Sequence, residues 1–369
     1  MGEIGNGKAM KKRHGKALLL GCVLLGGLPA LTFPLHADPV RNVPGKVRNV
    51  PGKASAAPLV PLAAEPVPHP DESWATPGLV GTRLAPRMMP FVAETDQKPQ
   101  YTRQIVRVKW RLNDPIDLYV IRPAHAAKPP VVLFLYGYPN DAQRFLDDSY
   151  CQRVTRAGCA AVGFESALTG GRYHDRPMRE WFVSELAEAL ASSAHDVHYI
   201  LDYLATRGDL DMTRVGMFGE GSGGAVAVLA AGADPRIKAL DLLNPWGDWP
   251  DWAAQSPLIP EGERPRYVTA AFQKGVASLD PVAWLPRLKG RPLRLIQVKT
   301  FAEVPLPAQA ALSHALPAGG EGVAYEGNLD MWGAQSEGRL FAWLGRQLKD
   351  PGTATRPSAK PADFSAGRK

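Results

Sequence analysis

One stretch of this sequence combines a hydroxyl and a carboxylate in a glycine-rich turn. Residues 214–231 read RVGMFGEGSGGAVAVLAA: an apolar run, a cluster of glycines and then a run of small residues. Such a segment is typical of a strand, a tight turn and a helix. Within it, Ser222 carries the only hydroxyl and Glu220 the only carboxylate. A serine in such a turn attacks a carbonyl carbon when a neighbouring base removes its proton.

The segments around this turn predict an α/β fold. Apolar and alternating runs predict two antiparallel strands at 105–112 and 117–122, and further strands at 130–135, 159–164, 214–218, 237–243 and 293–298. Helical spacing predicts helices near 142–157, 194–206 and 225–231. Strands that alternate with helices in this way form a mostly parallel sheet covered on both faces. We therefore expect a three-layer α/β domain, with its mostly parallel sheet and an antiparallel N-terminal edge.

This ordered set of motifs resembles the α/β-hydrolase superfamily and is most similar to its dienelactone-hydrolase and prolyl-oligopeptidase-like branches. The resemblance spans about residues 105–348. It rests on the helix pattern DVHYILDYL from Asp196, on Arg207-Gly-Asp, and on the strand, turn and helix at 214–231. It implies the three-layer α/β-hydrolase fold. It also implies a G-x-S-x-G turn with a nucleophilic serine at its centre.

The motif falls on residues 219–223, Gly-Glu-Gly-Ser-Gly, which puts Gly221 at the nucleophile position. A glycine has no atom that can attack a carbonyl, so the acyl-enzyme route is closed in this register. Alternatively, Ser222 takes over in a turn displaced by one residue, although Glu220 then stands where a small residue is needed. In the unshifted register the backbone N–H of Ser222 would help to bind an oxyanion. We expect Gly221 at the apex with positive φ.

The other positions of the implied triad are also altered. The acid should follow the strand at 293–298, where Glu303 is the nearest carboxylate, and the histidine should lie in a loop at 325–333, which contains none. His314 occurs earlier, on a predicted helix. The family's His-Gly after the third strand is here Tyr136-Gly137, which keeps the glycine needed for close backbone approach. Without an imidazole in reach, a serine keeps its proton at neutral pH.

The densest aromatic cluster of the chain follows the strand at 237–243. Residues 244–252 read NPWGDWPDW and include Trp246, Trp249 and Trp252. They emerge at the carboxyl edge of the sheet, where open α/β sheets bind ligands. Two interpretations remain open. The tryptophans form a cap over a pocket and stack on a sugar or apolar ligand, or they pack on their own domain.

No motif predicts a cofactor, because nothing resembles a nucleotide-binding loop. His195 and His198 lie about one turn apart on a predicted helix that also carries acidic residues, a spacing that would suit a metal. No third and fourth ligands can be identified, so we expect two helix-surface histidines and no metal site. The segment 170–176, with His174 and Asp175, is expected to be a solvated loop.

Charge in the chain is concentrated at its N-terminal end. The 369 residues are 45% hydrophobic and carry a formal net charge of +7, with many of the basic residues before residue 54. No stretch interleaves basic and aromatic residues, so we expect no nucleic-acid partner. A basic start and an apolar run over 17–33 predict a signal peptide at 1–37, or else an uncleaved membrane anchor through 17–33. We therefore expect an exported protein that is periplasmic or secreted, with a membrane-anchored protein as the alternative.

Two segments that flank the predicted domain have compositions that are unsuited to forming a hydrophobic core. VRNVPGK occurs at 40–46 and again at 47–53, and a Pro- and Ala-rich composition continues beyond it. We expect a disordered linker over 38–72, a hydrolase-like domain over 73–349 and a disordered tail over 350–369. Cys151 and Cys159 lie inside the domain, where we expect free buried thiols rather than a disulfide.

Two functions are consistent with these residues. The first is an exported α/β-hydrolase-like protein without Ser-His-Asp catalysis, which binds a small-molecule, ester or peptide ligand or serves as a structural partner. The second is an active ester or peptide-bond hydrolase that uses a displaced Ser222, with Glu220, Glu303 or His314 as its base. Reaction with a fluorophosphonate separates them, because that reagent requires an activated serine.

Overall fold

The computed structural model describes residues 73–78, 88–111, 114–139, 142–168, 172, 182–336 and 339–349. The predicted signal peptide, linker and C-terminal tail lie outside the described residues, as do His174 and Asp175. What the sequence predicts for those segments stays a prediction.

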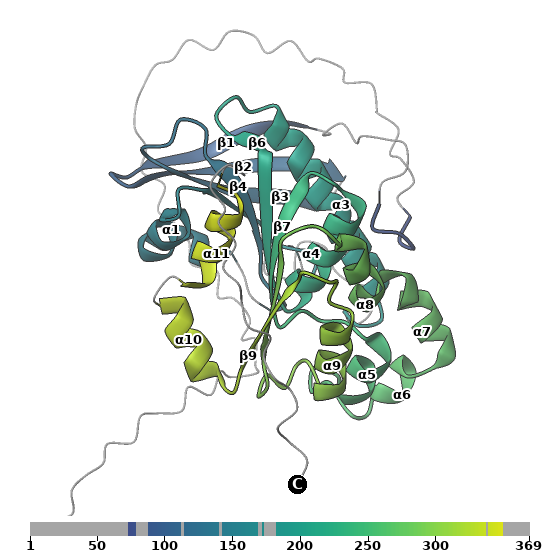
Figure 1. The fold of residues 1–369 in the computed structure, drawn as a ribbon. Helices are drawn as coiled ribbons and strands as arrows, with labels where there is room; N and C mark the ends of the chain where they lie inside the picture. Colours follow the sequence, from purple (N-terminus) through teal and green to yellow (C-terminus); the bar gives the residue numbers. More distant parts are fainter. Residues whose placement is uncertain are drawn as a thin grey trace, which may run out of the picture. The chain divides into compact units, whose positions relative to one another are not determined.

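A nine-stranded sheet, in the order β1-β2-β3-β5-β4-β6-β7-β8-β9, forms the centre of the described part (Figure 1). Strands β1 to β3 run antiparallel to their neighbours, and all pairs from β5 to β9 are parallel. This confirms the predicted sheet with its antiparallel N-terminal edge. The strands are β1 (Met88–Gln97), β2 (Tyr101–Arg111), β3 (Asp114–Pro123), β4 (Pro130–Leu135), β5 (Ala160–Gly163), β6 (Asp211–Glu220), β7 (Ile237–Leu243), β8 (Leu293–Val298) and β9 (Glu321–Tyr325).

Helices cover both faces of the sheet, α3 and α4 on one and α1 and α11 on the other (Figure 1). The helical elements are η1 (Gln143–Leu146), α1 (Asp148–Thr155), α3 (Leu186–Ala205), α4 (Ser222–Ala233), α5 (Trp249–Gln255), α6 (Arg264–Tyr267), α7 (Ala270–Val276), η2 (Ala277–Leu279), α8 (Pro281–Trp284), η3 (Leu285–Leu288), α9 (Leu306–His314), α10 (Asn328–Ser336) and α11 (Arg339–Gln347).

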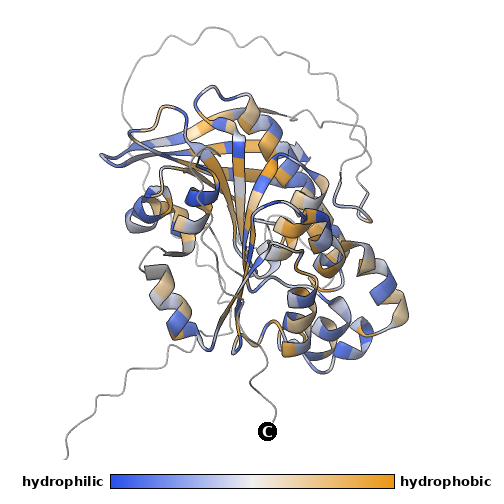
Figure 2. Ribbon diagram, viewed as in Figure 1, coloured by the Kyte–Doolittle hydropathy of each residue, from blue (hydrophilic) through white to orange (hydrophobic). Residues whose placement is uncertain are grey.

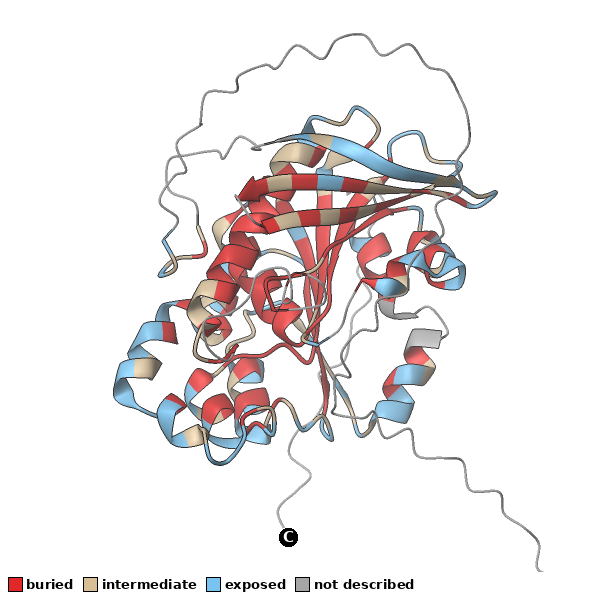
Figure 3. Ribbon diagram, turned by 180° about the vertical axis from the view of Figure 1, so that it is seen from behind, coloured by how far each residue is buried: buried red, intermediate tan, exposed pale blue. Residues whose placement is uncertain are grey.

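Strand β4 shows how the sequence produces three layers. Val131, Leu133 and Leu135 belong to the core beneath α3 and α4, whereas Val132 and Phe134 belong to the core on the opposite face. Because successive side chains of a strand point to opposite faces, a continuous apolar run must be covered on both sides. The central strands are accordingly hydrophobic in Figure 2 and buried in Figure 3.

Two predicted local structures are wrong. The single helix expected over 142–157 is divided into η1 and α1 by Asp147, which has extended backbone and whose side chain accepts a hydrogen bond from Tyr150 N at 2.7 Å. This capping bond favours a new helix start. The loop expected over 325–333 is instead the end of β9 followed by helix α10. In contrast, Cys151 and Cys159 are free and buried, as predicted.

The expectation of surface histidines on α3 is also wrong. His195 and His198 are both buried, and their Nε2 atoms lie 3.0 Å from the carbonyl oxygen of Thr76 and 3.3 Å from that of Ala230. The reason is that α3 is covered by α4 on one side and by the segment 73–78 on another. The described residues contain no cluster of metal-ligating side chains, and none of their helices is long and apolar enough to cross a membrane.

Neighbouring strands β7 and β8 share a buried ion pair. Asp241 and Arg294 are direct register partners, and Arg294 Nε and Nη2 donate to the two carboxylate oxygens at 2.8 and 2.6 Å. Burial raises the pKa of Asp241, and the guanidinium of Arg294 opposes that rise. Both groups are desolvated, so removing either one leaves an uncompensated charge inside the sheet.

We predict that Arg294→Ala lowers the free energy of unfolding by about 3–5 kcal/mol, because it leaves Asp241 buried and unpaired. Arg107→Ala is the matched control. Arg107 makes the same two-bond contact with its register partner Asp117, at 2.7 and 2.6 Å, but its side chain is 48% exposed. Its loss should lower stability by less than about 1 kcal/mol. Urea denaturation of both variants checks this, and equal losses would contradict it.

Candidate functional site

The turn between β6 and α4 consists of Gly221 alone. Strand β6 ends at Glu220, α4 begins at Ser222, and Gly221 has φ 54° and ψ −122°. This confirms the predicted positive φ, which glycine adopts without steric strain. A Cβ atom placed on Gly221 would find its nearest neighbour, Trp246 Nε1, at 3.4 Å. The apex therefore has the shape of a nucleophile elbow with room for a small side chain.

Glycines around the apex allow backbone to pack directly on backbone. A Cβ on Gly223 would lie 2.2 Å from Leu135 O, and one on Gly137 would lie 2.8 Å from Glu220 O. Real Cβ atoms do not approach other atoms so closely, so both positions require glycine. The loop after β4 thus lies against the apex, as the family resemblance implied for Gly137.

Ser222 lies one residue beyond the apex, at the first turn of α4. Its side chain is fully buried, and its Oγ accepts a hydrogen bond from Tyr138 N at 2.9 Å. Among the described residues this is the only hydrogen bond of that hydroxyl. Ser222 Oγ therefore joins α4 to the loop after β4, and it is hydrogen-bonded to no carboxylate or imidazole of the described residues.

Two carboxylates from different parts of the chain interact electrostatically beside the turn. Glu220 ends β6, and Glu303 lies half-buried in the segment after β8, where its backbone oxygen accepts a hydrogen bond from Ser256 Oγ at 2.8 Å. Burial raises the pKa of Glu303 to about 7; the charge of Glu220 adds to this rise and the indole N–H of Trp246 opposes it. Burial also raises the pKa of Glu220, opposed by Arg144. The site thus holds an acidic pair in which one member titrates near neutral pH.

The three tryptophans after β7 pack on their own domain, which is the second of the two interpretations. Trp246, Trp249 and Trp252 are each at most 1% exposed. The ring centroids of Trp246 and Trp252 are 4.9 Å apart, and Trp249 Nε1 donates to Leu279 O at 3.1 Å. Of the three, Trp246 is the one that faces the apex.

Tyr136, which stands where the family has a histidine, is part of the core on the α1 side. Its hydroxyl is hydrogen-bonded to that of Tyr150 at 2.6 Å, and the guanidinium carbon of Arg144 lies 3.6 Å from the centre of its ring. Burial raises the pKa of Tyr136 to about 12. This residue is therefore a neutral packing group at physiological pH.

None of the described histidines contacts the apex. His195 and His198 are held on α3, His125 is exposed after β3, and His314 is exposed at the end of α9. The described part of the chain thus offers no imidazole as a base for Ser222.

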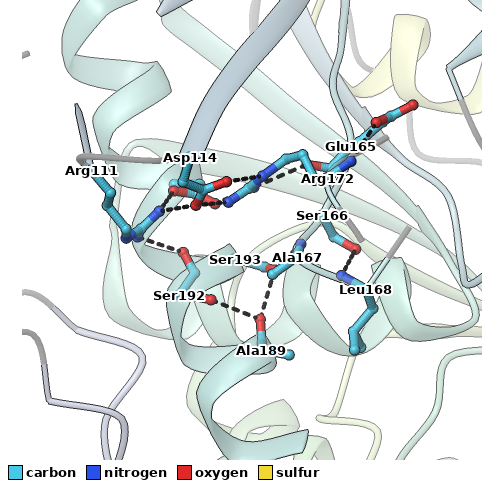
Figure 4. A network of polar contacts seen from close by, with 11 residues as sticks. Arg111, Asp114, Glu165, Ser166, Ala167, Leu168, Arg172, Ala189, Ser192 and Ser193 are labelled. Carbon is cyan, nitrogen blue, oxygen red and sulfur yellow. Dashed lines mark hydrogen bonds and ion pairs between the residues drawn. The ribbon is translucent and has the colours of Figure 1, made fainter. Parts of the chain in front are cut away.

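A buried ionic network fixes the loops beside this edge of the sheet (Figure 4). Arg172 Nε donates to Asp114 Oδ1 at 2.9 Å, and its Nη1 donates to Asp196 Oδ2 at 2.6 Å and to Glu165 O at 3.1 Å. Arg111 also contacts both aspartates. Arg172 belongs to the segment expected to be a solvated loop, yet it is only 3% exposed. The two acids compensate its charge, which is what allows it to be buried.

Three residues around the apex were not predicted from the sequence: Tyr138, Arg144 and Phe182. Tyr138 follows Gly137 directly, so its backbone N–H could have been expected near the turn. Arg144 influences Glu220 from the segment after β4, and the Phe182 ring lies 6.3 Å from that of Trp246. No sequence signal connects either of them with the turn.

Comparisons with known proteins place this geometry in a fold family. No family model matches the chain. The hydrolyase poxO of Penicillium oxalicum is 26% identical over 178 residues, which are 46% of this chain and 40% of that protein. This chain therefore matches only about two fifths of the length of that curated relative.

Two acetyl xylan esterases are among the similar solved structures. The one from Paenibacillus sp. R4 has a TM-score of 0.53 and 18% identity, covering 68% of this chain and 87% of its own. The one from a Thermoanaerobacterium species has a TM-score of 0.53 and 13% identity, covering 70% and 88%. The chain has the α/β-hydrolase fold, and the resemblance to that superfamily is confirmed at the level of the fold. Its structural relatives include esterases.

We predict that Glu303 makes stability fall as the pH rises. The pKa of Glu303 is about 7 in the folded protein and has its ordinary value of 4.5 in the unfolded chain. At pH values between these two, Glu303 keeps its proton in the folded protein but has lost it in the unfolded chain. Between pH 5 and pH 8 the wild type should therefore lose roughly 1–3 kcal/mol more than Glu303→Gln. Urea denaturation at both pH values measures this. Glu261→Gln, which changes an exposed carboxylate, should behave like the wild type; the same behaviour from Glu303→Gln would contradict the assignment.

Proposed function

We propose that this protein is an α/β-hydrolase-fold protein that binds a small-molecule, ester or peptide ligand at its elbow and does not use Ser-His-Asp catalysis. One observation carries the proposal: Gly221, with φ 54°, occupies the apex at which such a fold presents its nucleophile. A residue without a side chain cannot form a covalent acyl intermediate.

The groups around the apex support this proposal. The hydroxyl of Ser222 is buried and accepts a hydrogen bond from Tyr138 N, so using it as a nucleophile would require breaking that bond. The described histidines all lie elsewhere. What remains at the apex is an acidic pair and an indole N–H, which are groups that bind a polar ligand.

The alternative is an ester or peptide-bond hydrolase that uses Ser222. The observation in its favour is Glu303, whose pKa of about 7 is suitable for a general base. This mechanism requires Ser222 Oγ to leave Tyr138 N and to reach the substrate side of the turn.

We also propose that the protein is exported, on the pattern of residues 1–37 alone. A mature chain that begins at Asp38, identified by mass spectrometry of protein from the cell envelope or the medium, is the expected result. An intact N-terminus in the membrane fraction would instead support the anchored alternative, and an intact N-terminus in the cytosol would overturn both.

We predict that the wild-type protein is not labelled by a fluorophosphonate and hydrolyses p-nitrophenyl acetate no faster than Ser222→Ala. Gly221→Ser alone should gain little activity, because a serine without a general base lacks the cooperative effect of an assembled triad. An active triad esterase is the positive control for both assays. Robust wild-type hydrolysis that is lost in Ser222→Ala, with the circular dichroism spectrum unchanged, would establish the displaced-serine hydrolase instead.

A further inference from the structure

The segment 299–305 joins β8 to α9 and carries Glu303. Phe301 N donates to Val298 O at 2.9 Å, and Val304 N donates to Phe301 O at 3.2 Å. The segment therefore makes two consecutive turns. Glu303 is the third residue of the second turn, so its position depends on how these turns are held.

The side chain of Gln309, on α9, ties the two ends of this segment together. Gln309 is buried, and its Nε2 donates to Val298 O at 3.4 Å and to Val304 O at 2.8 Å. A glutamine amide nitrogen has two protons, and each of them is used on one of these carbonyls. Gln309 thus closes the segment across its ends, with Glu303 between them.

Gln309 is itself held against β8. Gln297 Nε2 donates to the backbone oxygen of Gln309 at 2.7 Å, and Ser313 Oγ donates to Gln297 Oε1 at 2.7 Å. Both glutamines are buried. Helix α9 therefore cannot slide along β8 without breaking buried hydrogen bonds, which would leave polar groups unsatisfied inside the protein.

A second tie comes from the end of α5. Ser256 is fully buried, and its Oγ donates to the backbone oxygen of Glu303 at 2.8 Å. Ser256 N in turn donates to Trp252 O at 2.9 Å, which fixes Ser256 at the end of its helix. The segment is thus held from two sides, at its ends by Gln309 and at Glu303 itself by Ser256.

These ties are polar, although they lie in the interior. Buried polar side chains cost free energy unless they are hydrogen-bonded, whereas apolar residues would fill the same space without that cost. What hydrogen bonds add is a defined distance and direction for the backbone that they hold. Such control matters for Glu303, because burial raises its pKa to about 7; the charge of Glu220 adds to this rise and Trp246 opposes it.

We propose that Gln309 and Ser256 are positioning residues for Glu303, which hold its backbone so that its carboxyl stays partly withdrawn from water. The inference goes beyond the proposed function, because it applies whether Glu303 contacts a ligand or acts as the base of the alternative hydrolase. Fluorophosphonate labelling that depends on Ser222 would overturn the proposed function and leave this inference untouched.

The experiment measures the pKa of Glu303 in the folded full-length protein. The ¹³C shift of its carboxyl carbon is followed against pH and assigned by its loss in Glu303→Gln. Gln309→Met keeps a side chain of similar length and removes both donors. Water should then reach the carboxyl more easily, so its pKa should fall from about 7 toward 4.5, by about one unit or more.

Gln297→Met is the matched control. It removes a buried glutamine of the same hydrogen-bonded chain, but one whose side chain is bonded to Gln309 and Ser313 rather than to the segment that carries Glu303. It should lower the stability and leave the pKa of Glu303 near 7.

Ser256→Ala is the second test variant, and it decides the matter if Gln309→Met does not fold. It removes the bond to Glu303 O and should lower the pKa of Glu303 in the same direction. A fall in only one of the two variants assigns the role to that residue alone. If the pKa is unchanged in every test variant that folds, or falls equally in Gln297→Met, these residues are merely structural and the inference is overturned.

Discussion

The close backbone packing at the turn between β6 and α4 is the constraint on which the site depends. Gly223 lies against the carbonyl of Leu135 at the end of β4, and Gly137 lies against that of Glu220. With no side chains between them, two neighbouring strands and a helix meet within a few ångströms. This contact holds the loop after β4 and the start of α4 against the apex, where Gly221 has φ 54°. The elbow is therefore preserved by packing, independently of whether a nucleophile occupies it.

Buried charges reinforce the sheet at two separate places. Asp241 and Arg294 join β7 to β8, and the network of Arg111, Asp114, Arg172 and Asp196 joins the β2 and β3 ends to α3. Charges buried this deeply persist only when they are paired, so each network restricts the positions of the segments that supply its members. Electrostatic contacts thus add to the apolar packing between β7 and β8 and between the β2 and β3 ends and α3.

The groups at the apex differ from those of a serine hydrolase, because they are acidic side chains rather than a basic imidazole. A triad needs an imidazole that accepts a proton from a serine. Here the groups that converge are two carboxylates with raised pKa values and an indole donor. Neither carboxylate is an imidazole, so these groups do not reproduce the base of a triad. The chain thus shares its fold with solved esterases, while the described residues place no imidazole at the apex.

The sequence by itself determined the α/β class, the buried strands and the identity of the apex residue, because apolar runs and glycine spacing are local patterns. It could not place Trp246 beside Gly221 or couple Glu303 to Glu220, because those pairs lie far apart in the chain and meet only when β6, β7 and β8 align. The burial of His195 and Arg172 was likewise decided by tertiary structure. A polar residue on a helix or loop is expected at the surface unless a distant segment covers it, and that covering is a long-range contact with no local signal.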